Sequence, residues 1–202
     1  MDSKVSAIIK IVLGLTIIFL TYKLYAIIQE PIQYEKIKKK RYTAVQERLE
    51  EIRDVQKAHR EVYSKFASDL DQLIAFLDTG QKAIIQRKDS SFTYYNETYQ
   101  QEMQKDTIIT TILGYESVKE SLFDSDYKPE RLRYIPFSEQ VPFMMDATKI
   151  EVNDVIVPVF EAVAPDTVIF HDVLNKYDQY IDEDHALKIG SLSQPTLSGN
   201  WK

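Results

Sequence analysis

Apolar residues fill the first part of the chain, where only Lys10 and Lys23 carry charge between Val5 and Ile28. As an α-helix rising about 1.5 Å per residue, this segment is long enough to cross a hydrocarbon core of about 30 Å. The two lysines flank its uncharged centre, and their long stems can bring the ammonium groups to lipid headgroups. We therefore predict a membrane-spanning helix over residues 5–28. Its lipid-facing centre consists of Ile11, Val12, Leu13, Leu15, Ile17, Ile18, Phe19 and Leu20.

Two other interpretations of this segment compete with a spanning helix. A cleaved secretory signal ends its apolar region at small residues, whereas this segment runs out through Tyr22, Lys23, Leu24 and Tyr25. The buried core helix of a soluble protein is seldom followed by a basic run. The pattern therefore favours an uncleaved anchor.

A basic cluster follows the anchor, and an acidic body follows the cluster. The cluster consists of Lys36, Lys38, Lys39, Lys40 and Arg41. We predict that it binds anionic lipid headgroups. Beyond Arg41 the chain has 17 basic and 28 acidic residues, which argues against a nucleic-acid partner, because binding phosphates requires clustered positive charge.

The next pattern is a long amphipathic helix, and Pro31 is interpreted as punctuation before it. Apolar residues recur there every three or four positions, which places them on one helical stripe. This helix seam consists of Val45, Leu49, Ile52, Val55, His59, Val62 and Phe66. Because the stripe lasts only about three heptads, packing on the chain's own domain is favoured over a coiled coil. A second, short helix follows, capped by Ser68 or Asp69 and closed by Gly80 in a left-handed conformation.

The second half of the chain has the composition of short strands. Four β-branched and aromatic runs, DTIITTIL, LRYIPF, VIVPVFEAV and DTVIF, are separated by turn-forming residues. Residues 87–105 are polar and rich in tyrosine, and we interpret them as a loop or weak helix. The sequence predicts an α+β fold with a small antiparallel sheet. Its expected parts are a short tail (1–4), the anchor (5–28), a basic connector (29–41), one α+β domain (42–190) and an irregular tail (191–202).

The order of these parts resembles type IV pilins and type II secretion pseudopilins. The resemblance is carried by IRDVQKAHREVYSKFASDLDQLIAFL, residues 52–77, in which a helix ending in tyrosine is followed by a turn and a leucine-rich helix. The chain lacks the glycine of the prepilin processing site and the glutamate of the apolar segment. KKKRYTAVQERLEEIRDVQ, LRYIPF and VPVFEA also resemble a family of uncharacterised single-pass envelope proteins of Bacteroidota. Both resemblances imply an envelope protein whose body lies outside the cytoplasm, and the missing processing site implies that it is not cleaved as pilins are.

The residue inventory predicts neither an active site nor a cofactor. The chain contains no cysteine, which excludes disulfides and thiolate chemistry. Its histidines are His59 on the seam, His171 at a predicted strand end and His185 in the acidic run IDEDH. That run is the best candidate metal site, but it lacks the spacing of a calcium loop, so a solvated turn is favoured. No motif for nucleophilic catalysis, zinc hydrolysis or nucleotide binding occurs.

We therefore expect a structural or assembly component of a bacterial envelope complex, of the secretion, pilus-like or motility type. The protein is expected to span the inner membrane once and to bind the lipid bilayer, other envelope proteins and further copies of itself. The lysines beyond the anchor, counted literally, would keep the body in the cytoplasm, whereas the resemblances favour a periplasmic body. The alternative is a ligand-binding or sensory module. Its aromatic pocket would be lined by Tyr94, Tyr95, Tyr99, Tyr134 and Phe137.

Overall fold

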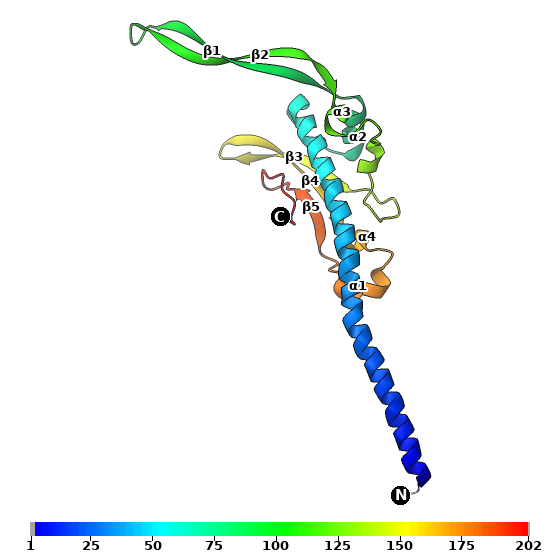
Figure 1. Cartoon of the computed structure of the whole chain (residues 1–202). Helices are drawn as coiled ribbons and strands as arrows, with labels where there is room; N and C mark the ends of the chain where they lie inside the picture. Colours follow the sequence, from blue (N-terminus) through cyan, green and yellow to red (C-terminus); the bar gives the residue numbers. More distant parts are fainter. Residues whose placement is uncertain (1–2, 202) are drawn as a thin grey trace.

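The computed structural model describes residues 3–201, and its longest element is the single helix α1, Ser3–Tyr63. Pro31 lies inside this helix, so its interpretation as a boundary is wrong. A proline inside a helix removes one backbone hydrogen bond, but good helix-forming residues flank it on both sides. Figure 1 shows that the first part of α1 extends freely, while the rest of the chain packs around its second part.

The seam of α1 forms one side of the domain core. Five seam residues are fully buried or nearly so, namely Val45, Leu49, Ile52, Val55 and His59. Phe66 is also buried, although it lies beyond the helix end, whereas Val62 keeps 38% of its surface exposed. The core begins nearer the N-terminus of α1 than predicted, because Tyr34 is 3% exposed and belongs to the same hydrophobic cluster.

Helix α2, Leu70–Thr79, follows after a short turn. Asp69 is its N-cap, since a carboxylate oxygen accepts a hydrogen bond from the Gln72 amide at 2.8 Å. Gly80 does not take the predicted left-handed conformation: its φ is −70° and its ψ is 146°. The chain passes straight from α2 into a strand here, and a Cβ on Gly80 would collide with the carbonyl oxygen and ring of Phe76. The glycine is needed here because its backbone lies close to Phe76, and not because of a left-handed conformation.

The next element is a long two-stranded antiparallel ribbon formed by β1, Gln81–Asn96, and β2, Gln101–Ser117. It extends sideways from the end of the molecule opposite to the N-terminus (Figure 1). The prediction of a loop or weak helix over residues 87–105 is wrong, because most of this segment is strand. Strands can form here because Phe92, Thr93, Tyr94 and Tyr95 are residue types that favour them.

A second sheet has the order β3-β4-β5 and is antiparallel throughout. Its strands are β3, Met144–Val152, β4, Val155–Pro165, and β5, Ala186–Gly190. The face that carries Phe160, Ala162 and Ala164 on β4 is fully buried, and both β4 and β5 contact α1. The predicted α+β class with an antiparallel sheet is therefore confirmed.

Short helical segments connect these strands, and two of them replace predicted strands. LRYIPF supplies the end of a 3₁₀ helix and an isolated bridge between Tyr134 and Pro142. DTVIF forms α4 because Pro165 ends β4 and Asp166 begins a helical turn. The connecting segments are α3, Val118–Leu122, η1, Pro129–Leu132, α4, Asp166–Ile169, α5, Leu174–Tyr177, and η2, Asp178–Tyr180.

Candidate functional site

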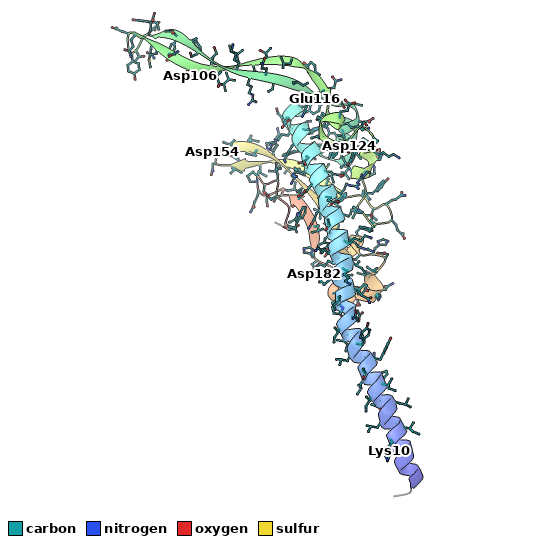
Figure 2. The ribbon with its side chains drawn as sticks, in the orientation of Figure 1. Lys10, Asp106, Glu116, Asp124, Asp154 and Asp182 are labelled. Atoms are coloured by element: carbon teal, nitrogen blue, oxygen red, sulfur yellow. The ribbon has the colours of Figure 1, made fainter. Side chains whose placement is uncertain are left out.

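The predicted anchor is uncovered in the structure. All eight residues named for its lipid-facing centre are between 57% and 68% exposed. Among the described residues, the helix from Ile9 onward is the one that is long and apolar enough to cross a membrane. Lys10 lies on this free part, whereas Asp182 lies where the domain meets the helix (Figure 2). A continuous apolar surface of this kind is typical of a helix that lies in lipid.

The basic cluster divides between solvent and domain. Lys36, Lys39 and Lys40 are exposed, and the ammonium of Lys38 lies 5.3 Å from the centre of the Tyr42 ring. Arg41 is not available to lipid as predicted, since it is 8% exposed. Arg41 contacts the domain instead of solvent. Headgroup binding by the four lysines stays a prediction.

Arg41 fastens α1 to the segment after α4. Its guanidinium donates to the Ile169 carbonyl oxygen at 2.7 Å and to both carboxylate oxygens of Asp172, at 2.6 and 2.8 Å. Hydrogen bonds from Arg41 hold the pKa of Asp172 below its usual range. A bidentate pair of this geometry fixes both position and orientation.

A second polar cluster lies next to this pair and includes the histidine of the acidic run. The Tyr42 hydroxyl donates to Asp166 at 2.5 Å, and His185 Nδ1 lies 3.0 Å from the same carboxylate oxygen. Burial, and then the bond to Asp166, raises the pKa of Tyr42. Burial and the charge of Asp166 raise the pKa of Tyr34 to about 12. His185 therefore contacts the domain interior, whereas Asp182, Glu183 and Asp184 of the same run are exposed, as predicted for a solvated turn.

The three histidines have different partners. His59 Nδ1 is 2.7 Å from the Lys65 carbonyl oxygen, and its ring meets Phe76 edge-on. His171 follows α4, and His185 precedes β5. Within residues 3–201, no three histidine, aspartate or glutamate side chains gather as metal ligands do.

The ribbon is the part of the domain that the chain leaves uncovered. Neither β1 nor β2 contains a buried residue. Opposite residues share a face, so Ile85 and Ile112 lie on one face, while Tyr94 and Met103 lie on the other. Apolar side chains thus occupy both faces. The exposed apolar residues are Ile84, Ile85, Phe92, Tyr94, Tyr95, Ile108, Ile109, Ile112, Leu113 and Tyr115.

The base of the ribbon forms a groove against the end of α1. Val62, the exposed seam residue, lines this groove together with Ile84, Ile85 and Tyr115. Its volume is about 770 Å³. The seam of α1 therefore continues past the core and meets the ribbon in a groove of mixed lining, since Glu61, Lys82 and Arg87 also line it.

The residues proposed for an aromatic pocket do not converge. Tyr94, Tyr95 and Tyr99 belong to the outer part of the ribbon and its turn. The Phe137 ring lies 5.3 Å from the guanidinium carbon of Arg41. The helix rises by about 33 Å between Arg41 and its C-terminal end, and the ribbon starts only beyond that end. Phe137 therefore lies far from the ribbon tyrosines. Tyr134 pairs with Pro142 in the same region as Phe137.

Sequence reasoning predicted a strand in DTIITTIL, residues 106–113, which lies in β2. It missed the pairing of this strand with β1, although one local signal indicates the turn between them. Asn96 sits between two runs of strand-forming residues, and its side-chain oxygen accepts hydrogen bonds from the amides of Thr98 and Tyr99 at 2.9 and 3.2 Å. An asparagine that bonds its own following backbone is typical of a turn. No protein-family profile, curated protein or solved structure matches this chain.

Proposed function

We propose that this protein is a single-pass structural or assembly component of a bacterial cell-envelope complex that works through protein–protein contacts. The ribbon carries this proposal, because it exposes apolar side chains on both faces and buries none. An isolated two-stranded ribbon is at best marginally stable in water, and apolar patches of this kind mark interaction surfaces. The helix α1 anchors one end of the molecule, and the ribbon contacts partners at the other end.

A pull-down from membranes tests the ribbon's role. The full chain is purified with Ile108→Asn and Ile112→Asn, which remove two apolar side chains from one face of β2. The matched control carries Thr107→Asn and Thr111→Asn, on the opposite face of the same strand. We expect the isoleucine variant to stay in the membrane and to lose its co-purifying proteins, while the control keeps them. Unchanged co-purification with the isoleucine variant would refute the proposal.

We further propose that the membrane is the bacterial inner membrane and that the domain lies in the periplasm. The resemblances to envelope proteins support this orientation, and the lysines after the anchor oppose it. Protease added to intact spheroplasts should digest the domain beyond Arg41 while a short N-terminal tag stays protected. Protection of the domain until the cells are lysed would place it in the cytoplasm.

A further inference from the structure

The ribbon has two free edges, and each runs the length of a strand. In a two-stranded sheet every strand pairs on one side only, so β1 and β2 each present a row of unpaired backbone N–H and C=O groups. Such an edge binds another strand through main-chain hydrogen bonds. The edges are 16 and 17 residues long, and no proline interrupts either of them.

We propose that the ribbon pairs with the ribbon of a second copy of this chain, with the β1 edge of one copy against the β2 edge of the next. This inference rests on the proposed function and names one partner for it. The contact would repeat the pairing already present within the chain, giving the order β1-β2-β1-β2 in a shared antiparallel sheet. All copies then keep the same direction along the sheet, as a head-to-tail contact requires.

The side chains of β1 and β2 already fit one another in this register. Within the chain, Ile85 faces Ile112, Tyr94 faces Met103, and Lys82 forms an ion pair with Glu116 at 3.3 Å. No two like charges face each other along the 16 paired positions of the ribbon. A second copy offers the same sequence at the free edge, so a contact in the same register has the same cross-strand pairs.

Pairing of β1 with another β1 fits less well. Two antiparallel copies of one strand are related by a two-fold axis, so the residue at the centre faces its own copy. β1 spans residues 81–96, and its overlap is greatest when Lys88 or Asp89 lies at this centre. The register centred on Lys88 brings two lysines together, although it also sets Arg87 opposite Asp89 on either side of them. The register centred on Asp89 brings two aspartates together, and like charges directly opposite are destabilising.

Pairing of β2 with another β2 has a similar defect. The complete overlap of residues 101–117 is centred on Ile109. That register places Glu102 opposite Glu116 at both ends of the strand, so two pairs of like charges face each other. Of these registers, the contact between unlike edges is the one in which no like charges face each other, and this favours it.

Disulfide trapping tests this arrangement, because the chain has no cysteine of its own. Thr93 and Gln104 face each other in the ribbon register, and both are exposed. Two differently tagged full-length copies are co-expressed, one with Thr93→Cys and the other with Gln104→Cys, and their membranes are oxidised. Opposite Cα atoms in an antiparallel pair lie about 4.5–5.5 Å apart, within reach of a disulfide. We expect the band to shift to dimer mass and to carry both tags.

The matched control replaces Gln104→Cys with Thr110→Cys, which lies about 20 Å further along β2 and should give no dimer. Each single cysteine copy alone should also remain monomeric. Dimers of Thr93→Cys with itself, or of Gln104→Cys with itself, would overturn the proposed edge pairing. A cross-link from these cysteines to a different protein would overturn it too, but would leave the proposed function standing. No cross-link, together with unchanged co-purification of the isoleucine variant above, would refute both.

Discussion

The two sheets of this protein are both antiparallel, yet they differ in what covers them. The β3-β4-β5 sheet packs against the helix α1, and Phe160, Ala162 and Ala164 on its β4 strand are completely buried. The β1-β2 ribbon has apolar residues on both faces and buries none of them. Strand-forming residues therefore do not by themselves build a core; a helix must lie across the sheet.

Shortening buried side chains on α1, the helix that covers the sheet, should have the largest effect on stability. We expect Leu49→Ala or Ile52→Ala to lower the free energy of unfolding by about 2–5 kcal/mol, since both side chains are fully buried. Ile109→Ala on the ribbon removes the same kind of side chain at 50% exposure and should cost less than about 0.5 kcal/mol. Chemical denaturation of the purified chain in detergent, below the concentration of any dimer, measures both. Equal losses would mean that the ribbon is covered after all.

Two glycines sharpen the comparison at the level of the backbone. Gly190 on β5 has φ of +77°, and a Cβ there would collide with the Phe160 carbonyl, whereas a Cβ on Gly114 of β2 meets nothing within 4 Å. Gly190→Ala should therefore destabilise the protein by about 1–3 kcal/mol. Gly114→Ala should be neutral or stabilise it by up to about 1 kcal/mol. Thermal melting of the two variants beside the parent distinguishes them, and a destabilising Gly114→Ala would contradict the open ribbon.

Two ion pairs give the smallest effect, and it depends on pH. Asp172→Asn breaks the pair with largely buried Arg41 and should cost about 1 kcal/mol at neutral pH, whereas Glu116→Gln breaks the more exposed pair with Lys82 and should cost less than about 0.5 kcal/mol. The lowered pKa of Asp172 means that its contribution is present above the ordinary aspartate pKa, about 3.9, and is lost as the pH falls through the folded value.

Melting temperatures measured from pH 7 down to pH 3 check this expectation. The parent and Asp172→Asn should differ at neutral pH and converge as the carboxyl of the parent takes up its proton. A difference that persists unchanged at the acid end of the series would mean that Asp172 acts through packing and not through its charge.

The parts of the fold that the sequence could predict are those with a strong period. The seam repeats every three or four residues, and its members from Val45 to His59 are buried as expected. Asp69 was predictable as a cap because its side chain needs only the local backbone. The α+β class followed from the change of period between the two halves of the chain.

The remaining features depend on contacts between distant residues. DTVIF has the composition of a strand, but Pro165 ends β4 before it and Asp166 bonds to Tyr42 on α1, so the segment forms a helical turn. Arg41 looked like the end of a lipid-binding run because nothing nearby in sequence reveals Asp172, 131 positions away. In the ribbon, the run of residues 106–113 was predicted as a strand and lies in β2. Residues 87–105 were not, because they are largely polar and no hydrophobic alternation marks a strand that has no core beneath it.

Because α1 is continuous through Pro31, a tilt at one end of the helix moves the other end of the molecule. One helix of 61 residues joins the apolar end to the foot of the ribbon, a length of about 90 Å. The tilt of such a helix responds to the thickness of the bilayer around it. A change in tilt of about 10° would displace the far end sideways by about 16 Å, roughly three strand spacings. The thickness of the surrounding bilayer would thus determine where the ribbons of neighbouring molecules meet.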